Sequence, residues 1–222
     1  IDRDILTRHV TGLGETPAWG VVPPGTAGYD PPRPRAAGMG KAQREAQARA
    51  LYAQAGYSAD RPLQLELRYN TSTPHRRLAL AVAAMWRETL GVRTTLRNEE
   101  WKVFVGTRRQ RAITEVFRGG WIADVDDARN FLQTFRSTSP SNWSGLDDPG
   151  FDALLDAADA APTLERRQAL LRRAETRLLA THAVVPVYFY TSRHLVHPDV
   201  LGFEANPLDR HPSRFLRFAE AE

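Results

Sequence analysis

Residues 62–69 read PLQLELRY, so apolar and polar side chains alternate along a stretch long enough to form a strand with one buried face. Residues 75–90 follow a turn and carry an apolar stripe with helical spacing. Composition then predicts a second strand over 92–96, a short helix over 100–109 and a third strand over 113–118. Because strands and helices alternate in this way, an α/β layer structure is expected.

The sequence on either side predicts more helices and one more strand. Residues 41–55 are rich in good helix formers. A second helix is expected to begin at Pro149, because Asp148 before it can cap the free N–H groups. A third helix over 162–182 precedes an apolar strand over 183–190. Two successive helices before that strand argue against a simple parallel doubly wound sheet, so we predict an α/β fold with a mixed β-sheet flanked by helices.

Helical spacing also predicts which side chains form the core. In the helix over 100–109, Trp101, Phe104 and Val105 are expected to face inward. The helix over 162–182 is expected to turn its leucines inward, beginning with Leu164. The remaining stretch between the third strand and Asp148 is polar and irregular, with a helical turn near 131–135.

Proline and glycine suggest how the chain is divided. Residues 1–40 hold a weak helical pattern over 2–13 and then an irregular segment rich in proline and glycine. We expect them to form a lead-in that belongs to an α/β ligand-binding lobe over 41–195. Residues 196–222 are expected to form an extended tail. The first residue is not methionine and no signal peptide is recognisable, so we interpret the chain as processed or as a fragment.

Composition excludes several classes of protein. The 222 residues contain no cysteine, which rules out disulfides, thiolate metal sites and a cysteine nucleophile. The formal charge is only +4, and the 30 basic residues, nearly all arginine, alternate with carboxylates instead of gathering in one segment. This distribution favours a solvated surface with a few anion-binding arginines over a nucleic-acid-binding face.

Motifs for catalysis or for metal binding are not found. The chain has neither a nucleophile elbow, a phosphate-binding loop nor a zinc-protease helix motif. His194 and His197 are spaced like metal ligands but have no evident third ligand. Asp124, Asp126 and Asp127 lack the glycine and the distal glutamate of a calcium loop. We therefore expect no metal, no cofactor and no enzymatic activity.

One group of residues does suggest ligand binding. Four arginines (Arg108, Arg109, Arg111 and Arg118) surround the predicted third strand, which runs through two glycines to Asp124. Glycine lets a ligand approach the backbone closely. Arg118 and Asp124 together would offer the two opposite charges that an extended zwitterion requires, although an internal ion pair between them is equally compatible with the residues alone.

At these residues the chain resembles the C-terminal half of the periplasmic oligopeptide-binding proteins, which deliver peptides to ABC transporters. The resemblance runs through nearly the whole sequence and rests on six motifs in the family's order: Thr16–Gly20 with Pro23-Pro24, Tyr69–Ser72 with His75, Glu100–Lys102, Gly120–Asp124, Val184–Tyr188 and Asn206–Asp209. It implies one lobe of a two-lobed type II periplasmic-binding-protein fold, with the first lobe absent from this chain and the tail returning toward it.

The resemblance also implies roles for particular residues. Asp124 would be a buried carboxylate that pairs with the α-ammonium of a peptide. Peptide backbone would be hydrogen-bonded by a ladder formed by Gly119, Gly120, Trp121, Ile122 and Ala123. The peptide's carboxylate would meet cationic or imidazole groups, which here are His75, Arg108 and Arg118. Trp101 and Trp121 are compatible both with a pocket wall and with core packing.

Three departures from the family pattern bear on peptide length. Ile122 stands where the family often has a disulfide-forming cysteine, the residues after Asp124 differ, and Thr11 replaces a basic residue. The implied function is a non-catalytic, monomeric periplasmic receptor for short peptides, with ABC permease subunits as partners and no role for nucleic acid. A murein-peptide-binding relative and, in another class, a peptide hydrolase are the alternatives.

Overall fold

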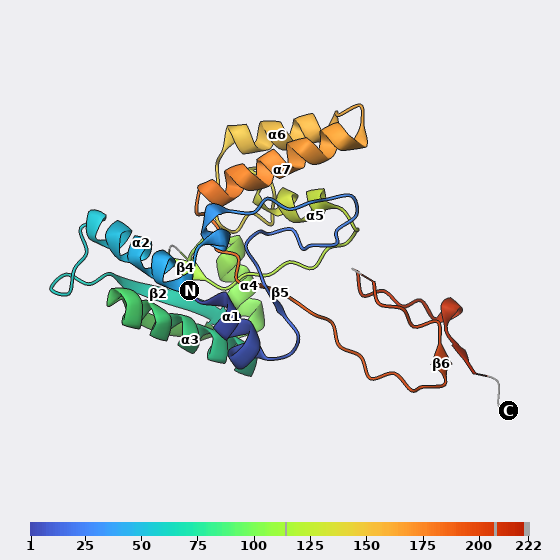
Figure 1. The fold of residues 1–222 in the computed structure, drawn as a ribbon, viewed down its shortest axis with the longest axis horizontal. Coiled ribbons are helices and arrows are strands. Elements are labelled where there is room, and N and C mark those ends of the chain that lie inside the picture. Colours follow the sequence, from blue (N-terminus) through green and yellow to red (C-terminus); the bar gives the residue numbers. More distant parts are fainter. Residues whose placement is uncertain (114, 207, 220–222) are drawn as a thin grey trace.

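The computed structural model describes residues 1–113, 115–206 and 208–219 (Figure 1). A part built on a small sheet packs beneath a layer of helices, and the C-terminal tail runs out to one side of both (Figure 1). Within the described residues, no helix is both long and apolar enough to cross a membrane.

The central sheet has three strands in the order β3-β2-β4, with β2 (Gln64–Asn70) in the middle. Both of its neighbours, β3 (Arg93–Glu99) and β4 (Val116–Phe117), run parallel to it. Parallel neighbours require a crossover, and the crossovers here contain α3 (Thr73–Leu90) and α4 (Trp101–Arg109). The predicted alternation of strands and helices is therefore confirmed for this part of the chain.

The core beneath the sheet is formed by alternate residues of β2. Leu67 and Tyr69 are buried against Leu78 and Val82 of α3, as the alternation and the helical stripe predicted. Leu6 closes this core from the N-terminal helix, which consists of a short α-helical turn, α1 (Arg3–Ile5), and a π-helical continuation, η1 (Leu6–Thr11).

A second core lies within the helical layer. Its most buried side chains include Phe151 and Leu155 of one helix and Leu171 and Leu178 of the next. Asp148 caps the first of these helices with its Oδ1, which accepts hydrogen bonds from two backbone N–H groups at 3.0 and 3.1 Å, as predicted. The helices of the layer are α5 (Ala128–Leu132) with η3 (Gln133–Phe135), α6 (Pro149–Asp159) and α7 (Leu164–Ala180).

The lead-in over 1–40 contributes buried residues to both cores. Its strand β1 (Thr16–Pro17) pairs antiparallel with β5 (Tyr188–Phe189), at the end of the chain segment that leaves α7. A 3-10 turn, η2 (Arg35–Gly38), then leads into α2 (Lys41–Gln54), which contacts α3 and buries none of its own residues. Residues far apart in sequence are thus held side by side.

A buried glutamate fixes the middle of this lead-in. Glu175 of α7 has no exposed surface. Its carboxylate accepts hydrogen bonds from the backbone N–H groups of Val21 (2.7 Å) and Val22 (3.1 Å) and from the Tyr29 hydroxyl (2.6 Å). Burial raises the pKa of Glu175, while these three hydrogen bonds act against that rise. Gly20 leaves the necessary space, since a Cβ there would lie 2.5 Å from Glu175 Oε1.

The tail forms a small structure of its own. Strand β6 (Val200–Leu201) pairs antiparallel with β7 (Arg217–Phe218), and a 3-10 turn, η4 (Ser213–Phe215), precedes β7. The tail extends away from the helices and the central sheet (Figure 1).

Two predicted strands are much shorter than expected. The strand predicted over 183–190 is paired as β5 only at Tyr188 and Phe189, and the Val187 carbonyl accepts one further hydrogen bond from the Ala18 N–H at 3.1 Å. Pro186, the next residue back, has no N–H to donate. The strand predicted over 113–118 is paired only as β4, and Thr114 lies outside the described residues. Parallel and antiparallel pairing both occur, as a mixed architecture requires, but in separate sheets.

Two expected core residues are instead exposed. Trp101 is 51% exposed and Leu164 is 65% exposed. Each is the first residue of its helix, Trp101 of α4 and Leu164 of α7, and its side chain is left exposed at that end. Phe104 is fully buried, as predicted.

Candidate functional site

The segment that continues β4 presents an unpaired backbone edge. The Arg118 N–H donates to the Arg68 carbonyl at 2.8 Å, which is the last bond of the ladder. Within the described residues, the backbone of 119–123 makes no hydrogen bond to other backbone. Gly119 and Gly120 are exposed, and Ile122 is 79% exposed. The segment therefore has free donors and acceptors that an added strand could use.

Asn130 holds the far end of this segment in place. Its side chain is buried at the start of α5, and its Oδ1 accepts hydrogen bonds from Trp121 Nε1 (2.9 Å) and from the Asp124 N–H (3.2 Å). The Asp124 carbonyl accepts a hydrogen bond from Arg210 Nη2 at 2.9 Å. The backbone of Asp124 is therefore fixed on both sides, which leaves its side chain to project from a defined position.

The Asp124 carboxylate is exposed, so the expectation of a buried carboxylate is wrong for this chain. It lies beyond the end of β4, and Asn130 contacts its backbone without covering its side chain. No ion pair to this carboxylate occurs within residues 1–113, 115–206 and 208–219. The internal Arg118–Asp124 ion pair that the sequence left open is therefore not formed.

Arg108 is a buried cation surrounded by aromatic rings. Its guanidinium lies 3.9 Å from the ring centre of Trp143, 4.6 Å from that of Phe104 and 5.7 Å from that of Trp101. Only 3% of Arg108 is exposed, its Nε has no hydrogen-bond partner, and the described residues provide no carboxylate to pair with it. Burial lowers the pKa of Arg108 to about 10, with smaller effects from Arg118 and Arg109, so it stays charged near neutral pH.

Arg118 joins Arg108 and His75 in a basic cluster, the name used below for these three residues. The Arg118 guanidinium donates a hydrogen bond to the Tyr190 hydroxyl and lies 5.7 Å from the centre of that ring. Its charge acts on both other members of the cluster. Burial lowers the pKa of His75, and the Arg118 charge lowers it further. The three predicted carboxylate-binding residues come from α3, α4 and the end of β4, and the charge of Arg118 reaches the other two.

His75 provides a titration test of this cluster. Replacing Arg118 with glutamine is expected to raise the pKa of His75, because a neighbouring positive charge that opposes its protonation is removed. The matched variant Arg109→Gln should leave that pKa unchanged, since Arg109 acts on Arg108 but not on His75. The measurement is an NMR pH titration of the His75 ring. An identical His75 pKa in the Arg118 variant would show that the two side chains are not neighbours.

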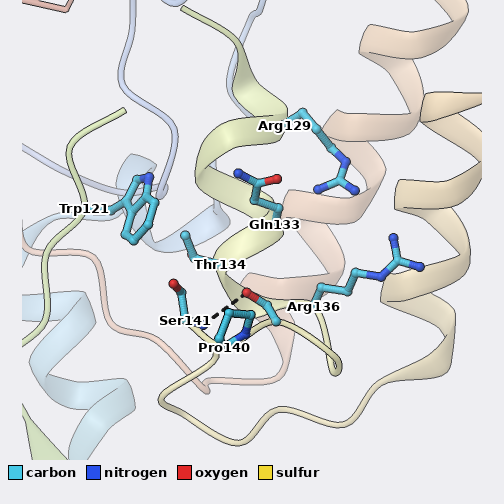
Figure 2. Close-up of a pocket in the computed structure, with 8 residues that line it drawn as sticks. Trp121, Arg129, Gln133, Thr134, Arg136, Pro140 and Ser141 are labelled. Carbon is cyan, nitrogen blue, oxygen red and sulfur yellow. Dashed lines mark hydrogen bonds between the residues drawn. The ribbon is translucent and has the colours of Figure 1, made fainter. Parts of the chain in front are cut away.

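Trp121 lines an open cavity of about 350 Å³ between the segment 119–123 and the helical layer (Figure 2). Arg129 and Arg136 also line it, but each already pairs with an aspartate of α6, at 3.0 and 2.7 Å. The Ser139–Ser141 turn closes one side (Figure 2). Because both arginines that line the cavity are already paired, the cavity is a less favourable anion site than the basic cluster.

Two acidic residues near Asp124 have structural partners. Asp126 Oδ1 accepts a hydrogen bond from the Ala27 N–H at 3.0 Å. Asp127 caps α5 through the Arg129 N–H and pairs with Arg167 at 2.9 Å. These contacts connect the lead-in, α5 and α7.

Sequence reasoning missed three residues that shape the site. Asn130, Tyr190 and Trp143 hold Asp124, Arg118 and Arg108 respectively. None stands within a recognisable motif, and Tyr190 and Trp143 lie far along the chain from the arginines that they contact. Trp101, weighed between core and pocket wall, is exposed beside Arg108, which excludes core packing in this chain.

Comparison with known proteins finds relatives over almost the whole chain. Residues 1–143 match the family model "Bacterial extracellular solute-binding proteins, family 5 Middle". The periplasmic oligopeptide-binding protein OppA of Escherichia coli (strain K12) is 39% identical over 215 residues, which cover 96% of this chain and 39% of that protein. The periplasmic murein peptide-binding protein MppA of the same strain is 37% identical over 206 residues, 93% of this chain and 38% of that protein. The chain thus spans about two fifths of the length of these relatives.

Solved structures agree with the sequence matches. Haemophilus influenzae OppA, in complex with the peptide RPPGFSPFR, is 31% identical with a TM-score of 0.87, covering 99% of this chain and 44% of that one. The predicted fold, one lobe of the type II periplasmic-binding-protein architecture, is confirmed by this likeness and by that to Escherichia coli MppA (34% identical, TM-score 0.88, 100% of this chain and 43% of that one). The chain therefore belongs to the bacterial extracellular solute-binding proteins of family 5.

Proposed function

We propose that this chain is the ligand-binding lobe of a non-catalytic receptor that captures short peptides for an ABC importer. One observation carries the proposal: an unpaired backbone edge has a cationic cluster at one end and a free carboxylate at the other. A peptide is the ligand that matches all three features, because it has an ammonium group, a carboxylate and a backbone of alternating donors and acceptors.

The length of the edge is compatible with short peptides. Arg118 and Asp124 are six residues apart, so an extended chain separates them by at most about 20 Å. A peptide paired along this edge in the manner of an added strand would be held through its main chain, which reads no side chains. The proposed roles are those predicted from the sequence: Asp124 for the ammonium group, 119–123 for the backbone and the basic cluster for the carboxylate.

An exposed Asp124 carboxylate is expected if this chain forms only one side of the binding cleft. An ion pair between Asp124 and a ligand ammonium strengthens when water is excluded. We infer that a first lobe outside this chain closes over the peptide, and that ABC permease subunits recognise the closed form through contacts absent from the open one. Monomeric action in the periplasm completes the proposal; the periplasmic location is supported by the relatives' printed names, which place them there.

A capture experiment separates the receptor from its rivals. Full-length protein is expected to bind tri-alanine in a calorimetric titration and to release it unchanged after overnight incubation, as judged by mass spectrometry. Appearance of alanine or dialanine would show that the protein is a hydrolase and not a receptor. Competition with a murein tripeptide distinguishes the second candidate, which the 37% identity to a murein peptide-binding protein favours: displacement by the murein peptide at a much lower concentration than by tri-alanine would establish that specialisation.

A further inference from the structure

Three side chains of the C-terminal segment 194–211 form a cluster that the peptide site does not use. His194 Nε2 lies 2.6 Å from Asp209 Oδ1, and His211 Nε2 lies 3.0 Å from the same oxygen. One ligand atom from each residue lies within 4.8 Å of the other two. All three come from the segment 194–211, so their proximity does not depend on how the tail sits against the sheet and the helices.

The cluster differs from the histidine pair that sequence spacing suggested. His197, three residues after His194, does not join it and instead lies 3.5 Å from Asp199. Asp209 and His211 lie beside His194 because the chain reverses between them. Asp209 has a left-handed backbone with φ of 52°, which turns the chain at the point where its carboxylate meets both imidazoles.

We propose that His194, Asp209 and His211 bind a first-row transition-metal ion, with Zn²⁺ as the probe of choice. Two imidazoles and one carboxylate form a common three-ligand zinc set, which leaves a fourth position open to water or to another ligand. The same set disfavours Mg²⁺ and Ca²⁺, which prefer oxygen ligands only.

The distances are compatible with an ion-binding arrangement. Ligand atoms bound to one tetrahedral zinc ion lie about 3.3 Å apart for bonds of 2.0–2.1 Å. The nitrogen–oxygen distances of 2.6 and 3.0 Å therefore need only small side-chain rotations to admit an ion. The His194 and Asp209 side chains are each 38% accessible, which leaves them room to rotate, whereas the His211 side chain is 12% accessible.

Neighbouring groups orient the ligands as an outer shell would. Phe203 stacks on His211 with ring centres 3.8 Å apart and meets His194 edge-on at 5.0 Å. Such outer contacts restrict the ligands and raise metal affinity.

The cluster also has an entry route. All three ligands line a cavity of about 410 Å³ between the tail and the lead-in. Arg210, which lies between two of the ligands in sequence, donates to the Asp124 carbonyl. A bound ion would therefore sit on the loop that supports the candidate peptide-binding segment.

A direct contact of Asp209 with the two histidines, with no ion between them, is the competing explanation, and a metal titration separates the two. Calorimetric titration of the full-length protein with Zn²⁺ is expected to give one site. His194→Ala and His211→Ala should each weaken that site at least about tenfold, because removing a ligand costs more than removing an outer-shell group.

The matched control is His197→Ala, since His197 is an exposed histidine of the same tail outside the cluster. Its zinc affinity should equal that of the unchanged protein. Far-UV circular dichroism checks that each variant is folded, and visible absorption of bound Co²⁺ reports directly on the ligand set. The proposal is overturned if the double variant His194→Ala/His211→Ala binds Zn²⁺ as tightly as the unchanged protein, or if His197→Ala weakens binding equally.

Discussion

Asp124→Asn is expected to weaken the binding of peptides with a free amino terminus by about 2–5 kcal/mol, or roughly 30-fold to several thousand-fold. Asparagine keeps the size of the side chain but removes the charge that would pair with the ligand ammonium. The backbone contacts from Asn130 and Arg210 are unaffected, so the segment should keep its position. Calorimetric titration of full-length protein with tri-alanine provides the measurement.

N-acetyl-tri-alanine is the control ligand, because it has no ammonium group to lose. The unchanged protein should bind it weakly, and Asp124→Asn should change that affinity little. Asp126→Asn is the control variant: this neighbouring carboxylate is engaged with the Ala27 N–H and should not affect the amino-terminal preference. Equal losses for the free and acetylated peptides in Asp124→Asn would remove Asp124 from its proposed role, even if the receptor function survives.

Glu175→Ala is expected to lower the free energy of unfolding by about 3–5 kcal/mol, the largest effect on stability that we expect from one side chain. Glu175 is fully buried and accepts three hydrogen bonds. Alanine leaves the N–H groups of Val21 and Val22 and the Tyr29 hydroxyl without a partner and opens a cavity between α7 and the lead-in. The melting temperature should fall by roughly 10 °C, at 2–4 °C per kcal/mol for a chain of this size.

Glu175→Gln is the matched control, because it keeps the volume and one acceptor oxygen. Its oxygen can retain the bonds from Val21 and Val22, and the Tyr29 hydroxyl can accept from the new amide. The loss of stability should therefore be clearly smaller than for alanine. Equal melting temperatures for the alanine variant and the unchanged protein would show that Glu175 does not anchor the lead-in.

Local signals predicted the long elements well. The helix predicted over 41–55 is α2 (Lys41–Gln54), and the alternating stretch 62–69 became the central strand β2 (Gln64–Asn70). Asp148 caps α6 as its position before proline indicated. These features depend on neighbours within a few residues, which explains why the sequence alone was sufficient.

Short strands and helix-end exposures were harder to predict. β-composition over 183–190 predicted a full strand, but the paired part, Tyr188–Phe189, begins only after Pro186, which has no N–H to donate. Trp101 fits an inward stripe by spacing, yet its side chain is 51% exposed at the start of α4. Strand length and burial depend on what lies opposite, and neither is encoded in the segment itself.

The sequence by itself determined the family, the type of the long elements and the set of charges near the glycine-rich segment. Only the tertiary structure decided which charges are already paired: Asp124 has no ion-pair partner within the described residues, whereas Asp126 and Asp127 contact the lead-in and α7. Only the tertiary structure, again, places His211 close to His194. Charge pairing depends on a few ångströms between segments that lie far apart along the chain, and residue spacing contains no such distance.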